Sequence, residues 1–169
     1  MLAAVVMGVS GCGKSSVGAA VADAIGGHFL DGDDLHPPAN VEKMARGVPL
    51  NDADRGPWLD RVGQALAERD GPTIIGCSAL KRIYRDHIRA HAGAVTFLHL
   101  EGQRDVIAAR MAARADHFMP LSLLDSQFAA LEPPGPDETA VTVDINQNFD
   151  KVVADLVTAL KERLQWHAR

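Results

Sequence analysis

The stretch that decides the fold is Gly8-Val9-Ser10-Gly11-Cys12-Gly13-Lys14-Ser15, close to the start of a chain of 169 residues. It matches the phosphate-loop pattern G-x-x-x-x-G-K-[S/T] at every fixed position. In such a loop the glycines let successive backbone N–H groups turn inward around an anion, and the following helix adds the free N–H groups of its first turn. The stretch therefore predicts a site that binds the phosphates of a nucleotide.

The residues on both sides of this loop fit the strand, loop and helix order that the motif requires. Leu2 to Met7 is an apolar run typical of a buried strand, and apolar residues recur at helical spacing from Val17 to Ile25. We expect Lys14 to reach the β- and γ-phosphate oxygens as a catalytic cation, and the Ser15 hydroxyl to bind Mg²⁺. The predicted nucleotide contacts in this region are Gly8, Ser10, Gly11, Cys12, Gly13, Lys14, Ser15 and Ser16.

The composition is that of one globular domain, which we expect to span residues 1–169. A net charge of −5 argues against a general nucleic-acid or membrane binder, so an anionic substrate must meet a local group of cations. The two cysteines, Cys12 and Cys77, form no metal or disulfide pattern, which favours reduced thiols in the cytoplasm. The apolar N-terminal run lacks a basic leader and predicts a strand rather than a signal peptide.

Strands and helices alternate along the chain. Short apolar runs predict strands at 2–7, 28–30, 73–77, 95–100 and 140–143, with helical spacing between them. This order predicts an α/β fold, a five-stranded parallel sheet flanked by helices. Residues 51–55 suggest a polar turn within a substrate-covering segment at about 34–56, and the helix after Cys77 is expected to include Leu80. A break at 115–120 between two helical patterns predicts a helical lid at about 110–125.

Two acidic residues follow the second predicted strand directly. Asp31 and Asp33 are two apart in an extended segment, so both side chains face the same way, at the strand end where ligands bind in such sheets. Phosphoryl transfer needs one group that accepts the proton of the attacking hydroxyl. We expect Asp33 to take that part and Asp31 to lie at Mg²⁺, while a polar turn that caps the next helix is the alternative.

Several basic residues are candidates for holding anions. Arg55, Lys81 and Arg85 suit an anionic substrate, since basic side chains bind carboxylates, although a solvated helix face would show a similar pattern. Arg110 and Arg114 are four residues apart, hence on one helix face, from which they could contact nucleotide phosphates. His117 lies in the predicted lid, where it could contact the substrate.

A phosphate loop alone does not distinguish a kinase from a GTP switch, a motor ATPase or a nucleotide-binding regulator without catalysis. The base-recognition sequence Asn-Lys-x-Asp of guanine-nucleotide switches does not occur, and no long apolar strand ends in the Asp expected for a motor ATPase. A small-molecule kinase is therefore favoured, with a non-catalytic regulator as the alternative from another class.

A set of further motifs resembles the gluconokinase family over nearly the whole chain. These motifs are Met7 to Ser15, Leu30-Asp31-Gly32-Asp33, Leu35-His36-Pro37, Pro49-Leu50-Asn51-Asp52, Asp54-Arg55, Pro57-Trp58-Leu59, Cys77-Ser78-Ala79-Leu80-Lys81, Tyr84-Arg85-Asp86, His117-Phe118, Ser126-Gln127-Phe128 and Leu131-Glu132. The resemblance implies a P-loop kinase fold, ATP and Mg²⁺ as cofactors, phosphorylation of D-gluconate at its 6-hydroxyl, and a homodimer.

The resemblance also implies roles for single residues. Asp33 would lie at the acceptor hydroxyl and Asp31 near Mg²⁺, with substrate bound by Arg55, Lys81 and Arg85 and the lid cations supplied by Arg110 and Arg114. A shikimate kinase is the second enzyme alternative, but that family is expected to show a Gly-Gly-Gly turn where Cys77-Ser78-Ala79 stands here.

Overall fold

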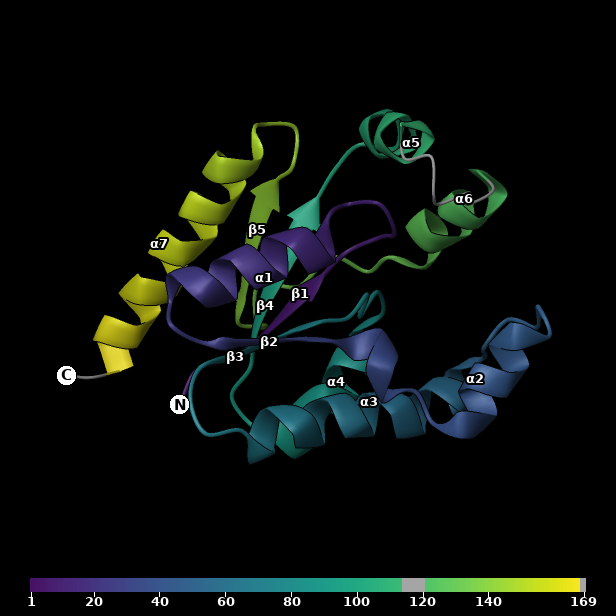
Figure 1. Ribbon diagram of the computed structural model, residues 1–169, viewed down its shortest axis with the longest axis horizontal. Coiled ribbons are helices and arrows are strands. Elements are labelled where there is room, and N and C mark those ends of the chain that lie inside the picture. Colours follow the sequence, from purple (N-terminus) through teal and green to yellow (C-terminus); the bar gives the residue numbers. More distant parts are fainter. Residues whose placement is uncertain (114–120, 168–169) are drawn as a thin grey trace.

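The computed structural model describes residues 1–113 and 121–167, and its centre is a parallel sheet (Figure 1). The five strands are β1 (Ala3–Met7), β2 (His28–Asp31), β3 (Thr73–Gly76), β4 (Thr96–Glu101) and β5 (Ala140–Asp144). They are arranged in the order β2-β3-β1-β4-β5, and every neighbouring pair is parallel. The predicted α/β fold with a five-stranded parallel sheet is confirmed.

Helices cover both faces of the sheet, because β1 alternates its side chains between two apolar clusters. Ala4 and Val6 belong to the cluster that α1 and α7 complete, whereas Val5 and Met7 belong to the cluster beneath α3 and α4 (Figure 1). The helices are α1 (Lys14–Ala24), α2 (Pro38–Ala45), α3 (Asp52–Glu68), α4 (Arg82–Ala92), α5 (Arg104–Ala112), α6 (Leu121–Ala130) and α7 (Phe149–His167), with a short 3-10 helix at Gly32–Leu35.

Two helix starts differ from the sequence predictions. The polar stretch after Leu50 is the first turn of α3 rather than a free turn, because the Asn51 side chain accepts from the Asp54 N–H at 2.8 Å and the Asp54 carboxylate accepts from the Asn51 N–H at 2.9 Å. Helix α4 begins only at Arg82, so Leu80 and Lys81 lie in the irregular segment before it. In that segment Ala79 has a positive φ of 44°, which a helix does not allow.

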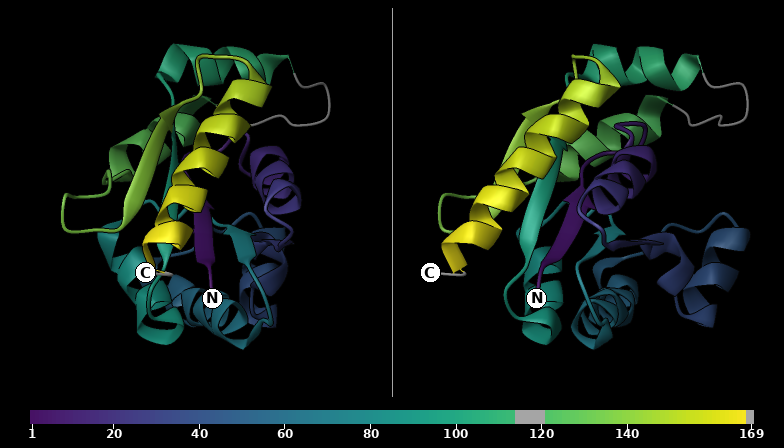
Figure 2. Two further views of the ribbon diagram at one scale, coloured as in Figure 1. Left: turned by 90° about the vertical axis from the view of Figure 1, so that its left-hand side faces the viewer. Right: turned by 60° about the vertical axis from the view of Figure 1, so that its left-hand side comes forward.

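Two peripheral parts flank the end of the sheet that carries the phosphate loop. Figures 1 and 2 show α2 on one side of this loop and the α5–α6 pair on the other. Helix α2 falls within the predicted substrate-covering segment, and residues 114–120 of the predicted lid lie outside the described part of the chain. Within the described part, no helix combines the length and the apolar character needed to cross a membrane.

Helices α3 and α4 pack closely at one glycine. A Cβ atom on Gly63 would lie 2.7 Å from the backbone oxygen of Ile88 and 2.9 Å from the His91 Cβ, whereas a Cβ atom on Gly56 in the same helix would meet nothing closer than 3.6 Å. Neither glycine has a positive φ. The two positions therefore differ in the space around them rather than in backbone conformation.

We expect Gly63→Ala to lower the free energy of unfolding by about 1–3 kcal/mol, because the added methyl group forces α3 and α4 apart. The matched variant Gly56→Ala should be neutral or stabilising by up to about 1 kcal/mol, since alanine restricts the unfolded chain and costs no packing. Urea denaturation measures both. A Gly63→Ala protein as stable as Gly56→Ala would show that the close helix contact is not required.

Candidate active site

Three loops meet at one edge of the sheet, because the strands before them are parallel and in register. Val6 and Asp31 both pair with Gly76, so β1, β2 and β3 end side by side. The Gly8 N–H donates to the Ser78 oxygen at 3.2 Å, which joins the phosphate loop to the segment after β3. A Cβ atom on Gly32 would lie 2.4 Å from the Gly76 oxygen. The acidic turn can therefore pack this closely against β3 only because residue 32 is a glycine.

The phosphate loop has the conformation that its sequence predicts. Gly13 has a φ of 94° and lies directly before α1, which starts at Lys14. The Lys14 ammonium donates to the Gly8 oxygen at 3.0 Å and to the Val9 oxygen at 3.1 Å. The lysine is thus folded back over the loop, with its ammonium group at the Gly8 and Val9 carbonyl oxygens.

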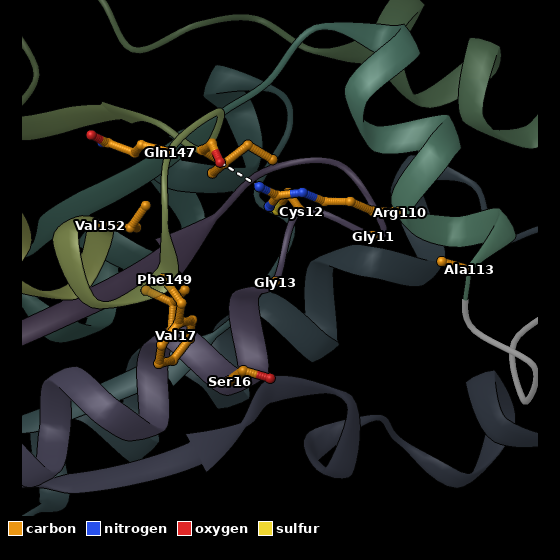
Figure 3. Close-up of a pocket in the computed structure, with 11 residues that line it drawn as sticks. Gly11, Cys12, Gly13, Ser16, Val17, Arg110, Ala113, Gln147, Phe149 and Val152 are labelled. Carbon is orange, nitrogen blue, oxygen red and sulfur yellow. Dashed lines mark hydrogen bonds between the residues drawn. The ribbon is translucent and has the colours of Figure 1, made fainter.

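A cavity of about 340 Å³ opens beside the phosphate loop (Figure 3). Arg110 reaches it from α5, and its guanidinium donates to the Ile145 oxygen at 2.5 Å. The structure thereby brings Arg110 together with three predicted loop residues and Ser16. The lining residues are Gly11, Cys12, Gly13, Ser16, Val17, Arg110, Ala113, Ile145, Gln147, Phe149 and Val152.

The far wall of this cavity was not predicted from the sequence. Ile145, Gln147 and Phe149 belong to the connection between β5 and α7 and to the start of that helix. They form no motif, and only the topology could have indicated them, because this connection leaves the sheet at the edge where ligands bind. An aromatic ring, an amide and an aliphatic side chain suit a flat heterocyclic base.

The acidic turn places its two carboxylates differently. The Asp31 carboxylate accepts from the Asp33 N–H at 2.9 Å and caps the short helix, as the alternative interpretation of the sequence proposed. Loss of hydration and the like charge of Asp31 raise the pKa of Asp33, although water screens both effects because the side chain is 83% exposed. Lys14 acts on Asp33 as a nearby positive charge. The turn thus presents an exposed carboxylate near Lys14 of the phosphate loop.

Two of the predicted substrate cations gather around one tyrosine. The Arg55 guanidinium carbon lies 5.5 Å from the centre of the Tyr84 ring, and the Lys81 ammonium lies 5.6 Å from it. Lys81 also pairs with Asp52 at 3.3 Å, and the Tyr84 hydroxyl donates to the same carboxylate at 2.5 Å. The start of α3 and the segment before α4 therefore present two cations together.

Arg85, the third predicted substrate cation, has a different place. Its side chain is 0% exposed and donates to the two carboxylate oxygens of Glu138 at 2.8 and 3.0 Å and to the backbone oxygens of Ala79 and Leu80 at 2.8 and 3.2 Å. No open face is left for a ligand. In contrast to the prediction of substrate contact, the structure places Arg85 in support of the strained turn at Ala79.

Helix α6 is attached to the phosphate loop by a reciprocal pair of hydrogen bonds. The Ser10 N–H donates to the Gln127 side-chain oxygen at 2.6 Å, and the Gln127 amide nitrogen donates to the Ser10 hydroxyl at 2.9 Å. An ion pair between Arg104 and Asp125 joins α5 to α6. Arg114 and His117, the two other predicted lid residues, lie outside the described residues.

Both cysteines are buried. Burial raises the pKa of the Cys77 thiol to about 12, and it also raises the pKa of Cys12. A thiol that stays protonated is a poor nucleophile. This agrees with the interpretation of Cys77 as a buried strand-end residue.

Comparisons with known proteins give a consistent result. No protein-family model matches the chain. The chain is 48% identical over 152 residues to the thermosensitive gluconokinase of Escherichia coli (strain K12), an alignment that covers 88% of this chain and 81% of that protein. It superposes with a TM-score of 0.88 and 46% identity on the crystal structure of a gluconokinase from Sinorhizobium meliloti 1021, covering 99% and 98% of the two chains. Shikimate kinase from Aquifex aeolicus shares the fold, with a TM-score of 0.64, 14% identity and coverage of 97% and 99%.

The different surroundings of Arg85 and Lys81 lead to a prediction. Arg85→Met should lower the free energy of unfolding by about 3–5 kcal/mol, because the buried Glu138 carboxylate loses its buried partner and keeps only Arg89 and the Gly135 N–H. Lys81→Met should leave it nearly unchanged, since the Lys81–Asp52 pair lies at the surface. Guanidinium denaturation measures both. Equal stabilities of the two variants would contradict the supporting part that the structure gives to Arg85.

Proposed function

The chain belongs to the gluconokinase family, and from this premise we propose that it transfers the γ-phosphoryl group of ATP to the 6-hydroxyl of D-gluconate. The products are ADP and 6-phospho-D-gluconate. The observation that carries the proposal is the junction of the phosphate loop with the Asp33 turn at one sheet edge, where Lys14 acts on Asp33. A donor phosphate and an acceptor hydroxyl can meet there.

Each of the described site residues has its own role in the proposed reaction. Asp33, whose carboxylate is exposed, accepts the proton of the attacking hydroxyl. Lys14, held over the phosphate loop, stabilises the negative charge on the transferred group. Arg110 lines the same cavity as Gly11, Cys12, Gly13 and Ser16, and we assign all five to the nucleotide. The cavity wall at Gln147 and Phe149 takes the adenine base.

We assign Mg²⁺ to Ser15 and Asp31. Ser15 follows Lys14 at the start of α1, and Asp31 ends β2, so both supply the hard oxygen donors that Mg²⁺ prefers. Mg²⁺ usually takes only one or two protein ligands and completes its shell with phosphate and water. When bound, the ion neutralises charge on the phosphates.

The paired cations supply the contact for the acid group of the substrate. Gluconate carries one carboxylate, and Arg55 and Lys81 lie on one tyrosine ring at the start of α3 and before α4. The charge of Arg55 reaches His36, whose ring nitrogen lies 4.0 Å from Asp33. We therefore place the carboxylate end of gluconate at these cations and its 6-hydroxyl end at Asp33.

Wider properties of the protein belong to the same proposal. A single domain, 1–169, would close over its ligands with a lid at about 110–125 and a covering segment at about 34–56. A homodimer is what the family resemblance implies. A cytoplasmic location is supported by the buried free thiols of Cys12 and Cys77.

A coupled ADP-release assay with ATP and Mg²⁺ tests the function by comparing gluconate, shikimate and AMP as acceptors. We expect turnover with gluconate, and we expect Asp33→Asn to lower kcat by about 10²–10⁴-fold because the base is lost. ATP affinity should be unchanged in that variant, and Asp34→Asn, an exposed neighbour on the same turn, should remain active. Turnover of shikimate or AMP but not gluconate would overturn the substrate. Stimulation by no acceptor would favour a regulator.

A further inference from the structure

His36 is fixed against the acidic turn by an aromatic stack. Its side chain is 6% exposed, and its ring lies 4.2 Å from the Trp58 ring at an interplanar angle of 17°. Trp58 in turn donates its indole N–H to the Gly32 oxygen at 2.8 Å. The imidazole is therefore held at a defined position relative to the turn that carries Asp33.

The hydrogen bonds of Asn40 determine which nitrogen of this imidazole carries the proton. The Asn40 amide nitrogen lies 2.9 Å from the backbone oxygen of Asp54. Only the nitrogen of the amide can donate to a carbonyl, so this contact fixes the orientation of the amide. The same nitrogen lies 3.3 Å from His36 Nδ1, which must then accept a hydrogen bond. A neutral His36 therefore carries its proton on Nε2.

The protonated nitrogen lies on the side of the proposed base. His36 Nε2 is 4.0 Å from Asp33 Oδ1, so a small rotation of the exposed Asp33 side chain brings the two into hydrogen-bond distance. Among the hydrogen bonds of the described residues, none is made by the Asp33 carboxylate, whose turn is held through its backbone N–H instead. An exposed carboxylate with no partner samples several rotamers. A hydrogen-bond donor at a fixed position would restrict the Asp33 carboxylate to fewer rotamers.

The charges around the pair favour a neutral donor. Burial and Arg55 lower the pKa of His36, whereas Asp33 raises it, with a net lowering. Asp33 itself is faced by Asp31 and Asp34 on its own turn and by Lys14 from α1. A neutral N–H can orient the carboxylate without the full positive charge that would weaken it as a base.

We infer that His36 is a positioning residue for phosphoryl transfer, and that its Nε2–H, fixed by Asn40 and Trp58, orients the Asp33 carboxylate toward the acceptor hydroxyl. The inference rests on the proposed function, because it takes Asp33 as the base. With this inference, the residues that serve catalysis include Asn40 in the first turn of α2, next to the acidic turn.

Three variants of His36 distinguish a residue that orients Asp33 from one that only packs against Trp58. His36→Phe keeps an aromatic ring on Trp58 but removes the donor, and it should lower kcat by about 10- to 100-fold, as expected for a lost hydrogen bond to a charged group. KM for ATP should not change. His36→Gln puts an amide nitrogen near the Nε2 position and should restore most of kcat, whereas the shorter His36→Asn reaches only the Nδ1 position and should not.

A spectroscopic measurement on the wild-type protein tests the tautomer without any substitution. With ¹⁵N-labelled histidine, the ring-nitrogen shifts of His36 at neutral pH should show protonated Nε2 and unprotonated Nδ1. The opposite tautomer or an imidazolium would overturn the inference. So would a folded His36→Phe protein with wild-type kcat, or a His36→Gln protein no more active than His36→Asn at equal melting temperature.

The proposed function and this inference fail in different ways. A wild-type protein that does not phosphorylate gluconate contradicts the proposed function. A wild-type protein that does so, with a kcat that is insensitive to the His36 substitutions, contradicts only the positioning part of His36.

Discussion

The site depends on the close approach of the acidic turn to the end of β3. At Gly32 the backbone comes so near the Gly76 oxygen that a Cβ atom would lie 2.4 Å from it. The same strand end continues into the segment whose Ser78 oxygen accepts from Gly8 of the phosphate loop. Since β3 lies between β1 and β2, these two contacts set the separation of the phosphate loop and Asp33. Donor and acceptor chemistry are thus brought together by backbone packing.

The cations of the site depend on a second, buried interaction. Burial by itself would raise the pKa of Glu138, but hydrogen bonds from Arg85, the Gly135 N–H and Arg89 outweigh it and lower that pKa well below its usual range. Glu138 therefore stays ionised, and Arg85 can pair with it while donating to the backbone oxygens of Ala79 and Leu80. Ala79 keeps its left-handed conformation, with a φ of 44°, because this support outweighs the strain. Lys81 reaches Tyr84 and Asp52 from the end of the supported turn.

Features that depend on residues close together in the sequence could be predicted from the sequence. Apolar runs gave the strands, the glycines and Lys14 gave the phosphate loop, and the strand-end rule gave the position of Asp33. Arg85 could not be distinguished from Lys81 in this way, because its burial depends on Glu138, which is 53 residues away along the chain. The tautomer of His36 depends likewise on Asn40 and on a backbone oxygen of Asp54, a relation that no spacing expresses.

The most direct test of this account is a crystal structure of the protein with gluconate and a non-hydrolysable ATP analogue. The account predicts that the 6-hydroxyl of gluconate lies within hydrogen-bond distance of the Asp33 carboxylate and in line with the γ-phosphate held by the phosphate loop. Its carboxylate should lie at Arg55 and Lys81. A gluconate molecule whose 6-hydroxyl contacts another residue, with Asp33 turned away from both ligands, would contradict the central claim.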